Sequence, residues 1–154
     1  MVHALEEIHR LLKPTGTLIE IHPSVDAPPF MEVRSNGQLS FSEADPVFDY
    51  EEDLRHADSA VATVLDRGAF VLDDRRTFEL RTYAASVKEL RDHWVLVGAY
   101  DPEEPEETLM RRRDEMYGRA QAALDAGSGW AELIYVEPAT MSRLTSSPSV
   151  PSRG

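Results

Sequence analysis

The sequence of 154 residues contains no cysteine, which excludes disulfide bonds, thiolate metal ligands and cysteine nucleophiles. It also has no apolar run near the roughly 18 residues that a membrane span requires. The N-terminal segment Met1–Glu7 lacks the basic region and apolar core of a secretory signal. We therefore expect a cytoplasmic protein with no membrane partner.

Basic residues are scarce, because 16 Lys and Arg stand against 28 Asp and Glu, giving a formal net charge of -12. Nucleic-acid surfaces depend on clustered Lys and Arg that bind phosphates. The one basic triplet, Arg111–Arg113, is flanked by acidic residues and is typical of a solvated helix face with local ion pairs. The sequence predicts no nucleic-acid partner.

Several motifs that carry chemistry are also missing. The 5 histidines form no H-x-H or H-x-x-x-H pair, so no metal site is predicted. No serine occupies a G-x-S-x-G elbow. An acidic cluster near residue 50 is interpreted as carboxylates that stabilise a helix N-terminus. Its members are Asp45, Asp49, Glu51, Glu52 and Asp53.

What the sequence does contain is a regular alternation of helices and strands. Apolar residues at helical spacing predict a helix over 2–13, stopped by the Lys13-Pro14-Thr15-Gly16 turn. A short β-branched strand follows at 17–21. Helix, tight turn and buried strand make half of a parallel α/β crossover. The helix begins without a preceding strand, so the chain reads as if it starts within a fold.

A hairpin is predicted inside the Pro- and Ser-rich segment 22–48. Met31 and Val33 alternate with polar residues, as do Leu39 and Phe41. A three-residue loop with Gly37 left-handed pairs Val33 with Leu39 and Met31 with Phe41, all on one face. A two-residue loop would place Val33 opposite Ser40 and mix the faces, so we favour the longer loop.

The rest of the chain predicts further elements of both kinds. Helices are expected over 49–66, over 86–97 and up to about residue 126, and strands over 70–83 and 130–136 or further. Ser86 and Glu89 form a capping box at one helix start. We expect a single half-domain over 1–144 and a disordered tail over 145–154, which has no core-forming residues.

Residues 4–20 carry a family resemblance, because they read ALEEIHRLLKPTGTLIE. This segment resembles the stretch of class I S-adenosylmethionine-dependent methyltransferases in which a helix reading L-x-E-I-x-R-x-L-K-P-G-G-x-L leads into the fifth strand. Thr15 departs from the first glycine of that pair, while Gly16 keeps the second. Less specifically, Gly68-Ala69-Phe70 resembles the start of the sixth strand, and 131–137 resembles the seventh, antiparallel strand.

The resemblance implies an α/β fold: a partial methyltransferase-like, Rossmann-like mixed sheet with an added β-hairpin and flanking helices. It implies methyl transfer from S-adenosylmethionine, held by a glycine-rich loop after the first strand and an acidic residue after the second. Neither feature occurs in this sequence, so no donor-binding residue is assigned. The lone chain is expected to bind no cofactor, and S-adenosylmethionine only if the missing half is supplied.

His22 is the candidate catalytic residue, because it follows the buried strand, and the carboxyl ends of strands face the ligand crevice in α/β sheets. A histidine there can act as general base toward a hydroxyl or amine acceptor. The alternative is a histidine that only hydrogen-bonds the loop backbone. Pro23 and Tyr83 are the candidate substrate-binding residues, with packing as the alternative for Tyr83.

Three functions remain open at this point. The first is a methyltransferase-family chain that is inactive until the donor-binding half is supplied. The second is a non-enzymatic oligomerisation or interaction module, and the third is a small-ligand binder that reuses the substrate-side pocket. Because a half-sheet would expose a strand edge and an apolar face, we expect self-association or a partner chain that covers that edge.

Overall fold

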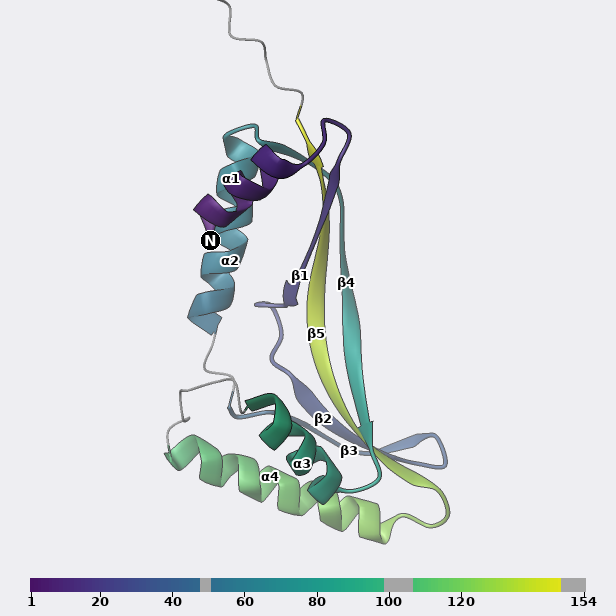
Figure 1. The fold of residues 1–154 in the computed structure, drawn as a ribbon. Coiled ribbons are helices and arrows are strands. Elements are labelled where there is room, and N and C mark those ends of the chain that lie inside the picture. Colours follow the sequence, from purple (N-terminus) through teal and green to yellow (C-terminus); the bar gives the residue numbers. More distant parts are fainter. Residues whose placement is uncertain (48–50, 99–106, 148–154) are drawn as a thin grey trace, which may run out of the picture. The chain divides into compact units, whose positions relative to one another are not determined.

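The computed structural model describes residues 1–47, 51–98 and 107–147 (Figure 1). The helices are α1 (Val2–Leu11), α2 (Glu51–Asp66), α3 (Val87–Gly98) and α4 (Glu107–Ala126). The strands are β1 (Thr17–Pro23), β2 (Phe30–Ser35), β3 (Gln38–Ala44), β4 (Phe70–Ala84) and β5 (Ala131–Ser146). They form one sheet in the order β1-β5-β2-β3, and β4 also pairs with β5.

The α/β class and the added hairpin are confirmed, but the predicted mixed sheet is wrong for the described strands. Neighbouring strands are antiparallel. The parallel partner expected for β1 would have to precede α1, and β1 instead pairs with the last strand of the chain. The helix-turn-strand pattern therefore predicted the elements correctly and their neighbours incorrectly.

The chain divides into two compact units. Unit 1 comprises 1–25, 50–78 and 139–154, and unit 2 comprises 26–49 and 79–138. Strands β4 and β5 contribute one part of their length to each unit. Each unit has its own hydrophobic core and is described by itself.

In unit 1, α1 and α2 pack on one face of the strands β1, β5 and β4 (Figure 1). Their shared core is apolar and drawn from all five elements. It contains Leu5, Ala60, Val61, Val64, Phe70 and Leu144, with Leu18 packed against it. The turn between α1 and β1 requires glycine at position 16, because a Cβ there would lie 2.9 Å from the Lys13 carbonyl oxygen.

The two faces of β1 have different surroundings. Leu18, Glu20 and His22 share the face that the helices cover, because side chains alternate along a strand. Ile19 and Ile21 lie on the opposite face and are 49% and 54% exposed. Strand β1 is also at an edge, since among the described strands it pairs only with β5. Unit 1 therefore leaves an apolar face and a strand edge uncovered within the described residues.

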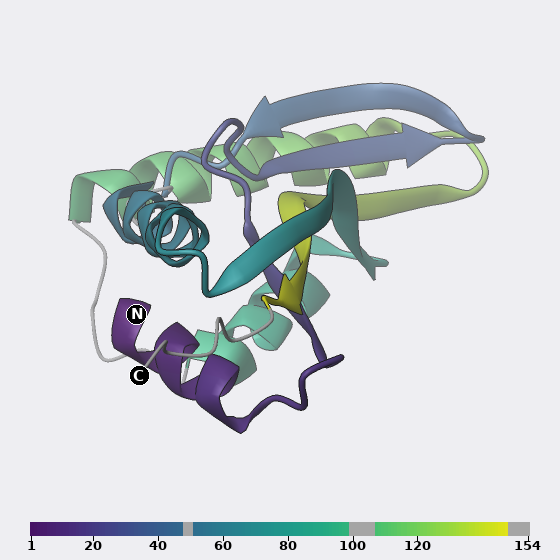
Figure 2. The same ribbon diagram turned by 90° about the horizontal axis from the view of Figure 1, so that it is seen from above.

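In unit 2, α4 packs along the β2–β3 hairpin, and α3 contacts α4 (Figures 1 and 2). The core joins both helices to the hairpin and to β5. It includes Met31, Val33, Leu90, Met116, Tyr117, Ala120 and Leu133. The predicted capping box at α3 is confirmed, because the Glu89 amide donates to Ser86 Oγ at 3.1 Å. The Glu89 carboxylate in turn accepts from the Ala85 amide at 2.7 Å.

The predicted register of the hairpin is wrong. The turn has two residues, Asn36 and Gly37, with φ of 50° and 79°, as a type I′ turn requires. The register then shifts at a β-bulge, so that Val33 pairs with Phe41. Ser40 is the extra residue, and its hydroxyl donates to the Val33 carbonyl at 3.1 Å. The bulge places Phe41 on the face of Met31 and Val33, whereas Leu39 pairs with Arg34 and is 53% exposed.

The last strand reaches beyond the predicted start of the tail at residue 145. Thr145 and Ser146 belong to β5, and Thr145 Oγ1 lies 3.2 Å from Asp73 Oδ1. The Ser147 amide donates to the Ala69 carbonyl at 3.0 Å. The remainder of the predicted tail, 148–154, lies outside the described residues.

Replacing two glycines of unit 2 by alanine tests this geometry. Gly37→Ala is expected to lower the free energy of unfolding by about 1 kcal/mol, because alanine is strained at φ of 79°. Gly118 lies within α4, where an added Cβ meets no atom within 4 Å. Gly118→Ala is therefore expected to raise stability by roughly 0.5–1 kcal/mol. Urea unfolding measures both, and equal effects of the two changes would contradict the turn assignment.

Candidate functional site

The predicted catalytic residue, His22, lies in a polar cluster of unit 1 that joins three elements. Glu20 and His22 come from β1, Asp58 from α2 and Arg75 from β4. We call these four residues the His22 cluster. Glu20 and His22 lie two residues apart on a strand and so point to the same face. Helix α2 packs on that face, and its Asp58 side chain lies close to the His22 ring.

Both nitrogens of the His22 ring face carboxylates. Nδ1 lies 2.6 Å from Glu20 Oε1, and Nε2 lies 3.4 Å from Asp58 Oδ1. The ring is 8% exposed, and the Glu20 side chain is 17% exposed. Arg75 Nη2 lies 2.6 Å from the same Asp58 oxygen. The arginine therefore balances part of the negative charge that the two carboxylates place around the ring.

This arrangement defines how the imidazole can carry a proton. With Nδ1 donating to Glu20, the neutral ring has its lone pair on Nε2. Nε2 is buried and makes no hydrogen bond with the described residues. A carboxylate at Nδ1 orients the ring and favours the tautomer with its proton on Nδ1. Because the Asp58 carboxylate already lies 3.4 Å from Nε2, this nitrogen can act as a general base only if an acceptor takes the place of Asp58.

Three members of the cluster, Glu20, Asp58 and Arg75, were not singled out from the sequence. Glu20 had a usable signal, since the spacing Glu-x-His within a strand places both side chains on one face. Asp58 had none, because it joins the cluster only through the packing of α2 on β1. Within the ranges that the structure describes, no three His, Asp or Glu side chains are arranged to hold a metal ion.

The two predicted substrate-binding residues are not joined to His22 in one described site. Pro23 follows His22 on β1, and its side chain is on the opposite face because the strand alternates. Tyr83 lies near the end of β4, 57% exposed, and belongs to unit 2. A shared substrate pocket formed by His22 and Tyr83 therefore stays a prediction.

Unit 2 contains a second polar cluster around Asp45, which the sequence placed among carboxylates at a helix start. The Asp45 side chain is fully buried and 2.6 Å from Arg113 Nη2. It also accepts from the Tyr135 hydroxyl at 2.7 Å and from the Val47 amide at 2.9 Å. With three donors, the buried carboxylate ties β3 to α4 and β5. Its role is therefore structural.

Burial and charge shift the pKa values of groups in this cluster. Burial alone would lower the pKa of Arg113, but the neighbouring charges, led by Asp45, outweigh it and raise the pKa. Burial raises the pKa of Tyr117, while the charge of Arg113 opposes the shift. Burial likewise raises the pKa of Glu137, against the influence of His93. Arg113 therefore remains a cation and keeps Asp45 paired.

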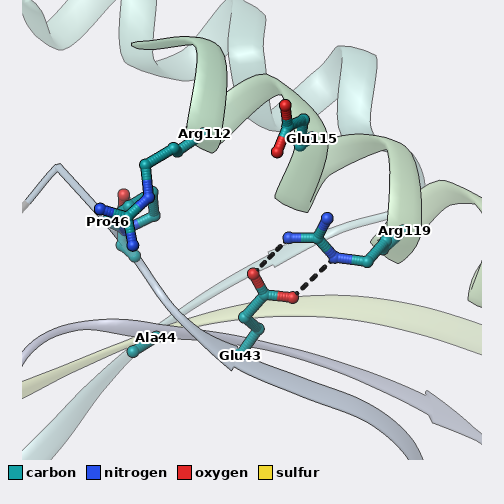
Figure 3. A pocket seen from close by; sticks show the side chains of 7 residues that line it. Glu43, Ala44, Pro46, Arg112, Glu115 and Arg119 are labelled. Atoms are coloured by element: carbon teal, nitrogen blue, oxygen red, sulfur yellow. Dashed lines mark hydrogen bonds and ion pairs between the residues drawn. The ribbon is translucent and has the colours of Figure 1, made fainter. Parts of the chain in front are cut away.

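A hollow of about 350 Å³ lies beside Asp45, between the end of β3 and α4 (Figure 3). Arg119 spans part of it and donates through Nε to Glu43 at 2.9 Å, with a second hydrogen bond from Nη2. Arg112 and Glu115 add one charge of each sign. Because its charges are mixed and two are already paired, the hollow favours neither an anion nor a cation.

Glu20→Gln tests whether the carboxylate orients His22. We expect a loss of about 1.5–3 kcal/mol in the free energy of unfolding, because a charge-assisted hydrogen bond to a buried ring is weakened. Nitrogen NMR of the ring is also expected to lose the single tautomer. Glu52→Gln, at an exposed position of α2, is the matched control, with an expected change within about 0.5 kcal/mol. Equal effects of the two changes would contradict the orienting role.

Comparison of the chain with protein-family models, curated proteins and solved structures finds no match. In the described ranges, no helix combines the length and apolar character needed to cross a bilayer.

Proposed function

We propose that this chain is the acceptor-side part of a class I S-adenosylmethionine-dependent methyltransferase. It acts together with donor-binding residues that are not among its 154 residues, whether they lie on the same polypeptide or on another. In this proposal the chain alone does not transfer methyl groups. His22 is the general base for a hydroxyl or amine acceptor.

The composition and position of β1 carry the proposal. Its outer face carries Ile19 and Ile21, and Leu18 adds an apolar side chain to the face that the helices cover, although Glu20 and His22 share that second face. Yet β1 lies at an edge of the described sheet, and the two isoleucines are about half exposed. An internal strand left at an edge is the feature expected where the other part of a sheet is absent.

The elements around β1 support the same interpretation. The segment that resembles the methyltransferase family folds as α1, the turn at Gly16 and β1. The strand that resembles the seventh, antiparallel strand is β5, and it pairs antiparallel with β1. The strand that begins after Gly68 is β4, which also pairs with β5. The antiparallel pairing of β5 with β1 supports the resemblance of β5 to the family's antiparallel seventh strand.

The His22 cluster supplies the chemistry that the proposal needs. Methyl transfer to a hydroxyl or amine releases a proton from the acceptor, and Nε2 of His22 can take it. Glu20 orients the ring through Nδ1 at 2.6 Å. His22 lies next to the last residue of β1. It is therefore at the carboxyl end of the strand, where ligands bind in open α/β sheets.

An interaction module is the second candidate, favoured by the same uncovered edge. In that case β1 would recruit a partner strand, and the His22 cluster would serve only to hold α2 on β1. The two candidates differ in what happens when a donor-binding segment is supplied. Only the methyltransferase requires His22 for turnover.

Calorimetric titration with S-adenosylmethionine and S-adenosylhomocysteine tests the proposal. The lone chain, shown to be folded by circular dichroism, is expected to give no binding heat. A chain extended by the codons upstream of Met1, if these encode a glycine-rich strand-loop, is expected to bind both. Saturable binding by the lone chain would contradict the missing donor site, and no binding by such an extended chain would contradict the family assignment.

In the extended protein, His22→Ala is expected to reduce kcat by about 100-fold or more while donor binding is retained, as for the loss of a general base. Glu20→Gln should reduce kcat by a smaller factor, since the ring remains. Full turnover in His22→Ala would overturn the catalytic assignment and leave the donor-binding result intact.

A further inference from the structure

The face of unit 1 that α2 covers carries further polar side chains where β1 and β5 pair. His22 lies opposite Thr140, and Glu20 lies opposite Ser142, in the antiparallel register. Directly opposite residues of an antiparallel pair share a face. Thr140 and Ser142 are 4% and 1% exposed. Two buried hydroxyls on the neighbouring strand therefore continue the His22 cluster within unit 1.

Packing alone does not account for these polar groups. Further along the same two strands, Leu18 lies opposite Leu144, and both belong to the apolar core of unit 1. Polar groups placed between a helix and a sheet cost free energy unless they are hydrogen-bonded. Nε2 of His22 and Oε2 of Glu20 are buried and make no hydrogen bond with the described residues. Both atoms can accept a hydrogen bond, so the cluster suits a ligand that donates.

The charges of the cluster favour a cationic donor. Glu20 and Asp58 supply two negative charges, and Arg75 supplies one positive charge. The guanidinium of Arg75 is already paired, because its Nη2 lies 2.6 Å from Asp58 Oδ1. With a neutral His22 ring, one negative charge is left unbalanced among the four residues. A ligand with a positive charge and several N–H donors is therefore favoured over a neutral or anionic ligand.

We propose that the His22 cluster binds the primary ammonium group of a small organic cation, and that this group is the methyl acceptor. The inference rests on the methyltransferase proposed above, and it selects the amine over the hydroxyl as the acceptor. An ammonium has three N–H donors, so it can donate to Nε2 of His22 and to Asp58 at the same time. A hydroxyl has one hydrogen and can donate to only one of them.

Asp58 is the residue that such a cation meets first. Its side chain is 28% exposed, whereas the side chains of His22 and Glu20 are 8% and 17% exposed. Asp58 Oδ1 lies 3.4 Å from Nε2. Two hydrogen bonds through one nitrogen need these atoms roughly 4.5–5 Å apart, so the carboxylate has to move by about 1–1.5 Å. It remains paired with the incoming positive charge after that movement.

This arrangement also gives the proton balance of the reaction. Nε2 of His22 takes one proton from the ammonium, which leaves a lone pair on the acceptor nitrogen. That nitrogen forms its bond to the methyl carbon while the bond from this carbon to the sulfonium sulfur breaks, with the electron pair remaining on sulfur. The product is an N-methylated ammonium that keeps the positive charge. His22 then returns its proton to solvent.

Nitrogen NMR of the histidine rings in the full chain, without any methyl donor, tests the binding step. Butylammonium is expected to shift the Nε2 signal of His22 saturably. Its dissociation constant should be at least about tenfold below that of n-butanol, because charge-assisted hydrogen bonds are stronger than neutral ones. The two probes have the same carbon chain, and sodium chloride holds the ionic strength constant. The His22 signal is identified by its loss in His22→Gln.

Three variants separate this site from a general effect of charge, each shown to be folded by circular dichroism. Asp58→Asn should weaken butylammonium binding by about tenfold or more, because the ammonium loses its anionic partner. Asp53→Asn, the same change at an exposed position of α2, is the matched control and should leave binding within about twofold. Arg75→Gln should tighten binding about threefold or more, because it removes the cation that competes for Asp58.

The outcomes distinguish this inference from the proposed function. No saturable shift with butylammonium, or equal affinity for n-butanol, would overturn the ammonium site. Equal losses in Asp58→Asn and Asp53→Asn, or weaker binding in Arg75→Gln, would overturn it as well. None of these results alters the donor-binding test. Ammonium binding by the lone chain, together with no donor binding by the extended protein, would support the site and contradict the methyltransferase.

Discussion

The structure depends on the backbone hydrogen bonding of β5. This strand pairs with β1, β2 and β4 and contributes to both units. Its residues are among the most buried of the chain on both faces, with Leu133 and Val136 at 0% and Ile134 at 1% exposed. Residues 133–136 of the strand are buried on both faces and have no charged side chain, as expected for a strand covered on both sides. The segment near the C-terminus therefore organises elements that precede it by more than 100 residues.

Much of the local structure could be predicted from the sequence. The break at Lys13-Pro14-Thr15-Gly16, the capping box at Ser86 and the apolar periodicity of α4 each depend on neighbouring residues, and each is found in the structure. The hairpin was also predicted, but its register was not. With the two-residue type I′ turn at Asn36-Gly37, a regular register would place Val33 opposite Ser40. The bulge at Ser40 instead places Val33 opposite Phe41. Neither constraint alone reveals it.

The candidate sites were predictable only in part, because their residues meet through tertiary packing. His22 was identified by its place at the end of a strand, and Glu20 was within reach of the same reasoning. Asp58 was not, since the position of α2 on β1 decides which of its carboxylates meets the ring. Asp45 was interpreted from the sequence only as one of several carboxylates at a helix N-terminus. It belongs to an acidic run, yet its side chain is buried and held by Arg113 and Tyr135.

Two edges of the sheet differ in their chemistry. The edge at β1 is apolar and has a buried histidine between two carboxylates at its end. The edge at β4 is charged, and its charges are paired within the chain, as Arg75 is with Asp58 and Arg81 with Glu79. The same long strand, β5, lies between them in the order of pairing.

The central claim is that β1 is an internal strand left at an edge. Hydrogen–deuterium exchange of the dilute chain, resolved to single amides, tests it most directly. The account predicts slow exchange throughout β5 and alternating exchange along β1, because only every second amide of an antiparallel edge strand faces its one partner. Uniformly slow exchange along β1 would contradict the account, since it would mean that another segment already covers that edge.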